Sequence, residues 1–383
     1  MNKVFILFIL VSTRTYSEIL KLPDPLISLH QEKIKTKEEW TKFRRPELLE
    51  LFRSQMYGHS PIFKPNQLSY KVKKENHQAI KGTATFKEVE ILIEGPRAKV
   101  LMNLLLFIPH KKNKSAPVFL LICNRNKNNI DPSRKIKREF WPVEEIIKRG
   151  YAAATFHYED LAPDNILTFK TKVINAFTSK YENDSWAAIS AWAFGASRAL
   201  DYFEKDKDLD AKRVALVGHS RGGKAALWAG AQDERFAMVI SNDSGAGGAA
   251  LSRGKSKGRE TIGFLYLKQA HWFANNFKQY GDKEEILPFD QHELISLMAP
   301  RSVYIASSSL DLWAAPNFEY QAAVEANSVY ALFDKKSIVG DFPSPGVKLH
   351  EGQVAYHLRA GKHDLKLWDW NAFMDFADKQ WGR

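Results

Sequence analysis

A serine set between two glycines is the strongest chemical signal in the sequence. Residues 218–222 read Gly-His-Ser-Arg-Gly, with Ser220 at the centre. Residues 214–217 form an apolar run typical of a buried strand, and the alanine-rich residues 223–231 have the composition of a helix. A G-x-S-x-G sequence between a strand and a helix is typical of a sharp turn that presents the serine as a nucleophile. The crowded turn requires small residues on either side of the serine.

A serine hydroxyl is a weak nucleophile until a nearby base removes its proton. Around such a turn the serine, an acid and a histidine follow one another in that order along the chain. His363 satisfies the order, because it lies in a polar turn between a predicted strand at 354–358 and a predicted aromatic helix at 368–381. His350 and His357 are weaker candidates, since both are expected to lie on strands.

Two carboxylates could orient this histidine. Asp311 follows the predicted strand 302–307, the usual position of the acid, whereas Asp243 follows the preceding predicted strand, 237–242. Either carboxylate could fix the tautomer of the imidazole. Asp311 could instead cap a helix, and Asp243 could brace the glycine-rich turn 245–248. The residues alone leave both assignments open.

The surrounding elements predict an α/β fold. Residues 84–93 and 99–107 alternate in part between apolar and polar residues, as half-buried antiparallel strands do. Later strands are short apolar runs separated by helices, which is typical of parallel strands covered on both faces. These strands are expected at 118–123, 152–156, 214–217, 238–240 and 303–306, and helices at 38–57, 143–148, 186–205 and 223–231. The pattern predicts an α/β-hydrolase fold, a three-layer sandwich with a mostly parallel central sheet and an antiparallel N-terminal edge.

Composition indicates one large globular catalytic domain over residues 18–383. The 383 residues are 44% hydrophobic and 26% charged, without internal repeats, and this is ordinary globular composition. Residues 1–17 combine Lys3, an apolar run and a polar stretch, which indicates a signal peptide and a secreted or periplasmic protein. No later segment approaches the roughly 18 apolar residues of a membrane span. The single cysteine, Cys123, cannot form an internal disulfide.

The formal net charge of +12 does not by itself indicate nucleic acid. Basic residues are scattered in short groups, such as that at 134–138, and form no basic helix or stripe. An acidic polysaccharide, or solubility alone, explains the charge better. No H-E-x-x-H or C-x-x-C pattern points to a metal, and no cofactor is predicted. The sequence does not determine the oligomeric state.

Four blocks of residues together resemble the bacterial glucuronoyl esterases of carbohydrate esterase family 15. They are Gly-His-Ser-Arg-Gly-Gly-Lys at 218–224, Asn-Asp-Ser-Gly-Ala-Gly-Gly at 242–248, Leu-Pro-Phe-Asp-Gln-His at 287–292 with Ala-Pro-Arg at 299–301, and Gly-Lys-His-Asp at 361–364. The resemblance implies a serine esterase that cleaves the ester between 4-O-methyl-glucuronic acid on xylan and an alcohol on lignin. The expected partner is therefore a glucuronoxylan or lignin–carbohydrate ester.

The resemblance also implies roles for single residues. Ser220 matches the nucleophile, His363 the base, and Arg221 the family's oxyanion-stabilising arginine. A guanidinium beside the nucleophile supplies positive charge where the tetrahedral oxygen becomes negative. The residues that resemble those holding the uronate sugar are Lys224, Trp313 and Glu260.

The family resemblance slightly favours Asp243 as the acid of the triad. Asp243 stands where many members have glutamate, and this shortens the side chain by one methylene and puts its reach to His363 in question. Asp311, in Asp-Leu-Trp at 311–313, matches the alternative acid position of some bacterial members.

Two other functions share part of this evidence. An acetyl esterase acting on polysaccharide has the same triad but needs no grip on a sugar acid, so activity on acetylated xylan alone would favour it. A carbohydrate-binding relative without turnover would not be labelled by a fluorophosphonate.

Overall fold

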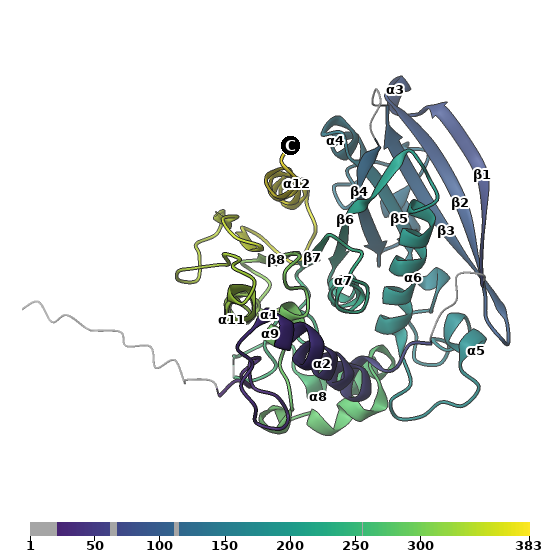
Figure 1. Ribbon diagram of the computed structural model, residues 1–383. Coiled ribbons are helices and arrows are strands. Elements are labelled where there is room, and N and C mark those ends of the chain that lie inside the picture. Colours follow the sequence, from purple (N-terminus) through teal and green to yellow (C-terminus); the bar gives the residue numbers. More distant parts are fainter. Residues whose placement is uncertain (1–20, 62–66, 111–114, 255) are drawn as a thin grey trace, which may run out of the picture.

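A ten-stranded sheet runs through the molecule (Figure 1). The computed structural model describes residues 21–61, 67–110, 115–254 and 256–383, so the predicted signal segment 1–17 lies outside the described residues. The strand order is β1-β2-β3-β5-β4-β6-β7-β8-β10-β9. The strands are β1 (Leu68–Gln78), β2 (Ala84–Glu94), β3 (Lys99–Pro109), β4 (Ala116–Cys123), β5 (Ala152–His157), β6 (Leu209–His219), β7 (Met238–Asn242), β8 (Ser302–Ser308), β9 (Lys348–Leu349) and β10 (Val354–Arg359).

The centre of the sheet is parallel and its edges are antiparallel. β5, β4, β6, β7, β8 and β10 pair in parallel, whereas β1, β2 and β3 pair antiparallel at one edge and β9 at the other. The carboxyl ends of the six parallel strands therefore lie at one edge of the sheet, where ligands bind in open α/β sheets. The predicted α/β-hydrolase sheet with an antiparallel N-terminal edge is confirmed.

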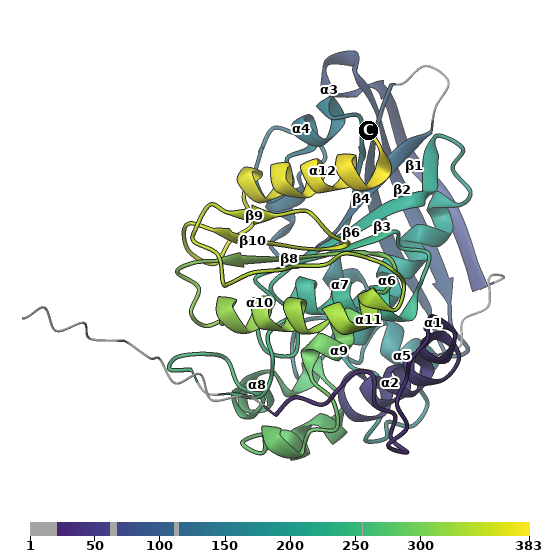
Figure 2. The ribbon, with the colours of Figure 1, turned by 60° about the vertical axis from the view of Figure 1, so that its left-hand side comes forward.

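Helices cover both faces of the sheet, with α4 and α12 on one face and α6, α7 and α10 on the other (Figures 1 and 2). The described helices are α1 (Lys37–Glu39), α2 (Arg45–Phe52), α3 (Ala79–Gly82), α4 (Val143–Lys148), α5 (Val173–Phe177), α6 (Ala188–Phe203), α7 (Arg221–Gln232), α8 (Ile262–Gln269), α9 (Gln291–Ser296), α10 (Pro316–Glu325), α11 (Asn327–Ala331) and α12 (Leu367–Trp381). No helix among the described residues is long and apolar enough to cross a membrane.

β4 shows why this sheet needs cover on both sides. Its side chains alternate between two separate apolar cores, because successive residues of a strand point to opposite faces. Leu120 and Ile122 pack in the core that includes α6 and α7. Phe119 and Leu121 pack in the core that includes Trp370 of α12. A strand that is buried on both faces therefore has a continuous apolar run, because each of its side chains enters one of the two cores.

The predicted helix 38–57 is confirmed as one continuous helical segment over residues 37–57, although it is not α-helical throughout. Two π-helical turns, Trp40–Arg44 and Arg53–Tyr57, flank α2. Pro46 is the second residue of α2, which follows directly on the first of these π-helical turns. β1 was not predicted from the sequence, because this edge strand is exposed along most of its length and has no apolar run.

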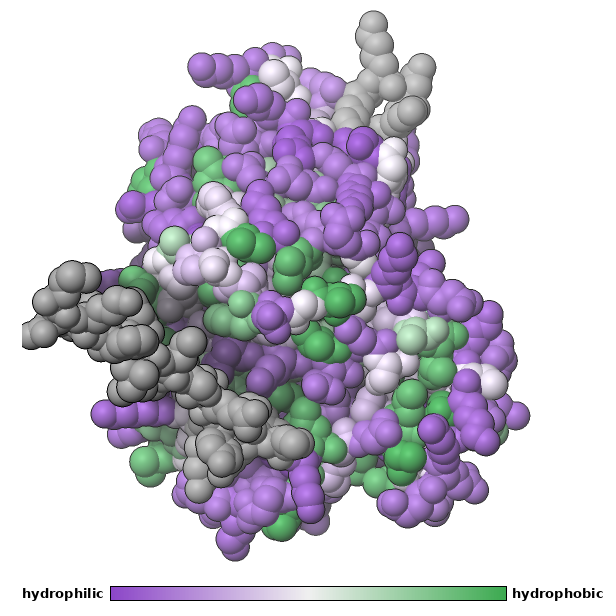
Figure 3. All heavy atoms as spheres, turned by 90° about the vertical axis from the view of Figure 1, so that its left-hand side faces the viewer, coloured by the Kyte–Doolittle hydropathy of each residue, from purple (hydrophilic) through white to green (hydrophobic). Residues whose placement is uncertain are grey.

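The surface differs in character from these cores. Figure 3 shows the face that contains the β9 edge of the sheet, where hydrophilic residues cover most of the upper part. Hydrophobic residues gather in separate groups across its middle and lower parts.

The packing of α7 on β7 yields a stability prediction. A Cβ added at Gly230 would lie 2.3 Å from Cγ2 of Val239 and 3.0 Å from the sulfur of Met298. We expect Gly230→Ala to lower the free energy of unfolding by about 1–3 kcal/mol through overpacking, measured by urea denaturation. Val239→Ala removes the obstructing methyl groups, so the double variant should lose less stability than the sum of the single variants. Strictly additive losses would contradict the contact.

Candidate active site

Ser220 lies in the turn that joins β6 to α7. Its backbone has φ 57° and ψ −128°, a conformation that a residue with a side chain rarely adopts. The N–H of Ser220 donates to the carbonyl oxygen of Asn242 at 2.8 Å and so holds the turn against β7. A Cβ on Gly218 would lie 1.9 Å from the carbonyl oxygen of Gly222. The first glycine of the motif is therefore required by close approach of the backbone.

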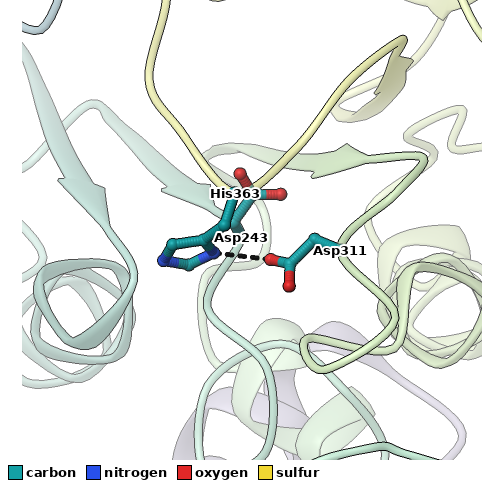
Figure 4. A group of neighbouring side chains, drawn as sticks. All are labelled: Asp243, Asp311 and His363. Carbon is teal, nitrogen blue, oxygen red and sulfur yellow. Dashed lines mark hydrogen bonds and ion pairs between the residues drawn. The ribbon is translucent and has the colours of Figure 1, made fainter.

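His363 is hydrogen-bonded to Asp311. The Nδ1 atom lies 2.5 Å from Oδ2 of the carboxylate (Figure 4). The two residues follow β10 and β8, which are neighbours in the sheet. The side chain of Asp311 is 6% exposed and that of His363 is 40% exposed. This bond places the proton on Nδ1 and leaves Nε2 as the basic nitrogen.

No hydrogen bond joins Ser220 to His363 among the described residues. Both follow parallel strands of the sheet, so their side chains belong to the same edge. Bonds of this kind are often long in a free enzyme and shorten when substrate binds.

Asp243, which the sequence favoured slightly as the acid, bonds to other partners. Its Oδ1 accepts the N–H of Ser308 at 2.6 Å, and its Oδ2 accepts the hydroxyl of the same serine at 2.8 Å. The N–H of Asp364 also donates to Oδ2, at 3.3 Å. Ligand atoms of Asp243, Asp311 and His363 lie within 4.8 Å of one another, the spacing of a metal site, but hydrogen bonds engage all three residues.

Asp243 and His363 titrate in different surroundings. Burial, and then the charge of Glu319, raise the pKa of Asp243 well above its ordinary value. Burial lowers the pKa of His363, but the hydrogen bond with Asp311 and the nearby carboxylates of Asp243 and Asp311 together outweigh this effect and leave the pKa above its ordinary value. The imidazole is thus a stronger base than a free histidine.

Arg359, at the end of β10, clamps the turn that carries His363. Its Nη2 donates to the carbonyl oxygens on either side of His363, at 2.9 and 3.0 Å. Nη2 also donates to the hydroxyl of Ser308 at 2.5 Å, and Nε donates to the carboxylate of Asp369 at 2.9 Å. This buried arginine therefore ties the histidine turn to β8 and to the first turn of α12.

A second histidine packs against His363. The ring of His219 is buried, and its centroid lies 4.5 Å from that of His363. Burial lowers the pKa of His219 well below its ordinary value, so the ring is neutral. Its Nδ1 lies 2.6 Å from Oδ1 of Asn242, and Arg125 donates to its Nε2 at 3.1 Å. Arg125 also forms an ion pair of 2.7 Å with Asp364, the residue after His363.

Arg221 begins α7 directly after Ser220. Its Nε lies 2.9 Å from Oδ2 of Asp164, whose other oxygen accepts from His271 at 2.8 Å and from Trp272 at 2.6 Å. The guanidinium carbon lies 5.6 Å from the centroid of the Trp272 ring, within cation–π range. The Arg221 side chain remains 30% exposed, so its charge can face a bound substrate.

Lys224 has no donor left for a ligand. The buried ammonium donates to the carbonyl oxygens of Ser244 at 2.7 Å and Ala246 at 2.5 Å, and to Oε2 of Glu260 at 2.8 Å. An ammonium has three donors, and these three acceptors satisfy all of them. The predicted contact between Lys224 and sugar hydroxyls therefore has no free N–H in this structure.

Trp313 is open to a ligand, and the largely buried Glu260 lies next to it. Trp313 is 41% exposed and packs edge-on against Phe264, with ring centroids 4.6 Å apart. The N–H of Glu260 donates to the carbonyl oxygen of Trp313 at 2.9 Å, so the two residues lie together. Within the described parts of the chain, Oε1 of Glu260 has no hydrogen-bond partner.

Comparison with known proteins finds esterases that are similar to this chain. A family model described as glucuronyl esterase of fungi matches residues 135–334. A carbohydrate esterase from an unknown prokaryotic organism is 38% identical over 391 residues, covering 93% of this chain and 89% of its own length.

Two solved structures are similar along most of the chain. A glucuronoyl esterase from Solibacter usitatus superposes with a TM-score of 0.87 at 40% identity, covering 94% of this chain and 98% of its own. A promiscuous family 15 esterase from a marine bacterial metagenome has a TM-score of 0.85 at 37% identity and covers 94% and 96%. The chain therefore belongs to the glucuronoyl esterases of carbohydrate esterase family 15, which are carboxylic ester hydrolases with an α/β-hydrolase fold.

Proposed function

We propose that this esterase hydrolyses 4-O-methyl-glucuronoyl esters that link xylan to lignin alcohols, through a covalent intermediate on Ser220. The observation that carries the proposal is the hydrogen bond between His363 and Asp311, at the same sheet edge as the strained serine. Fungal relatives named 4-O-methyl-glucuronoyl methylesterase support the acyl group, among them one from Wolfiporia cocos that is 32% identical over 47% of this chain. A polymeric substrate of this kind suits an exported enzyme, so the proposal includes export directed by residues 1–17.

The reaction begins when Ser220 attacks the ester carbonyl and His363 takes the hydroxyl proton on Nε2. The carbonyl oxygen becomes an oxyanion. The backbone N–H of Arg221 lies in the first turn of α7, where no helical carbonyl precedes it, and the guanidinium adds positive charge. His363 then protonates the departing alcohol. Water, activated by the same imidazole, hydrolyses the acyl-enzyme and frees the uronic acid.

Asp311 is the orienting acid in this proposal, and Asp243 has a positioning role. Asp311 holds the Nδ1 proton and stabilises the imidazolium that forms during transfer. Asp243 instead binds the end of β8 and the backbone next to the base. Each carboxylate therefore fixes a different part of the histidine turn.

The uronate sugar is bound at the side of the site formed by Trp313 and Glu260. The free Oε1 of Glu260 can accept a sugar hydroxyl, and the exposed indole can pack on the sugar ring. Lys224 contributes indirectly, because its ammonium fixes Oε2 of Glu260.

Ser220→Ala tests the covalent mechanism. We expect kcat for benzyl glucuronate to fall by roughly 10⁴-fold or more, because the nucleophile is lost. Labelling by a fluorophosphonate should disappear in the same variant. Turnover by the variant close to that of the wild type would rule out Ser220 as the nucleophile. Activity of the wild type on acetylated xylan, without activity on glucuronate esters, would show that the substrate is an acetyl ester instead.

The pH dependence of kcat/KM distinguishes the roles of Asp311 and Asp243. Asp311→Asn removes the bond that raises the pKa of His363, so the acidic limb of the profile should move to lower pH while the plateau falls by about 10²-fold to 10⁴-fold. The sign follows because only the neutral imidazole acts as a base. Asp243→Asn removes a carboxylate that also raises this pKa but leaves the hydrogen bond to Asp311 intact, so it should move the limb less than Asp311→Asn does. It should lower stability by about 1–3 kcal/mol, since the Asp364 N–H loses its acceptor. The reverse pattern would make Asp243 the triad acid.

The clamp is tested with Arg359→Lys, which keeps the positive charge but cannot reach both carbonyl oxygens beside His363. We expect kcat to fall by about tenfold to a hundredfold with a smaller change in KM, because the base is misplaced. Arg301→Lys is the matched control. Arg301 donates to backbone carbonyl oxygens of Phe236 and Gly230 next to the start of β8, at the opposite edge of the sheet. Similar losses of kcat in both variants would show a general structural effect.

A further inference from the structure

A polar pocket of about 500 Å³ lies beside the turn that carries His363. Three segments line it, and none of their residues has a role in the ester chemistry above. The lining residues are Arg125, Asn126, Asn128 and Asn129 after β4, then Lys137, Arg138, Glu139 and Phe140, and finally Asp364, Leu365 and Lys366.

Residues of the pocket contact the residues around His363. β4 is the neighbour of β6 in the sheet, so the segments that follow these two strands lie at the same edge. Arg125 bonds both to Asp364 and to His219, the ring that packs against His363. A polymer whose ester is bound at Ser220 therefore needs to extend only past the histidine turn to enter this pocket.

Positive charge predominates in the lining, with four cationic side chains against two carboxylates. Both carboxylates are already paired, because Lys366 lies 2.8 Å from Asp364 and 3.1 Å from Glu139. Arg138 is exposed and, among the described residues, its guanidinium forms no ion pair or hydrogen bond. The pocket thus offers an unused guanidinium, which matches a carboxylate in planar geometry.

Side-chain amides supply the remaining donors and acceptors. Oδ1 of Asn126 accepts the N–H of Asn128 at 2.9 Å, and Nδ2 of Asn129 donates to the carbonyl oxygen of Asn126 at 3.0 Å. These bonds shape the loop and leave the Asn128 amide exposed, and an amide can both donate to and accept from sugar hydroxyls. Phe140 is buried beneath Arg125, so the lining of the pocket has no exposed aromatic ring on which a nucleic-acid base could stack.

We propose that this pocket is a subsite for a second carboxylate-bearing sugar of the polysaccharide whose ester is cleaved at Ser220. Arg138 binds the carboxylate and Asn128 binds hydroxyls of the same sugar. The assignment rests on the proposed function and extends it from a single uronate to an acidic polymer chain.

Binding to the Ser220→Ala enzyme tests the subsite without turnover. The probe is an ester-free xylo-oligosaccharide with two glucuronate branches, titrated by calorimetry at low salt. Arg138→Glu should weaken its binding by about fivefold, and the difference should shrink at high salt because the charges are screened. The same oligosaccharide with its carboxyl groups reduced to alcohols should bind equally to both proteins.

Lys212→Glu is the matched control, because Lys212 is exposed near the start of β6, at the opposite edge of the sheet. Equal weakening by both substitutions, or a loss that persists with the reduced oligosaccharide, would overturn the subsite. Tighter binding of a short oligonucleotide at Arg138 would also overturn it. Turnover of benzyl glucuronate by the wild type is a separate readout, so a failure of the proposed function is distinguishable from a failure of the subsite.

Discussion

The close approach of two glycines, Gly218 and Gly222, is the constraint on which the rest of the site depends. Their backbones lie so close together that no side chain would fit between them. This close approach lets β6 pass directly into α7 with Ser220 held in a strained backbone conformation. Such strain persists only where the surrounding structure fixes the backbone. Here the fixing comes from the hydrogen bond to β7 and from the apolar core that packs α7 against the sheet.

A buried set of ionisable side chains carries that rigidity to the turn that holds His363. Asp243, Arg359 and Asp369 are all buried, and taking polar or charged groups out of water costs free energy unless each finds a partner. These three side chains find their partners largely in one another and in the hydroxyl of Ser308. Their shared target is the short turn around His363, which is otherwise exposed. The cost of burial is thus offset by contacts that fix an exposed imidazole.

The sequence predicted what is encoded locally and left open what depends on space. The parallel strands, the serine turn and His363 follow from apolar runs and from residues adjacent in the chain. The choice between Asp311 and Asp243 depends on where the loops after β8 and β7 point, which no spacing determines. Arg359 was missed because a single arginine at the end of an apolar strand has no motif. Lys224 was matched to a ligand role, but its neighbours in space take all three of its donors.

The exposure of His363 and Trp313 bears on the shape of molecule that the esterase can accept. A tunnel or a deep socket admits a polymer only from its end, whereas a surface site can receive it sideways. An ester in the middle of a branched chain could therefore dock without prior trimming by other enzymes. The released alcohol, however bulky, could then diffuse away without a conformational change of the protein.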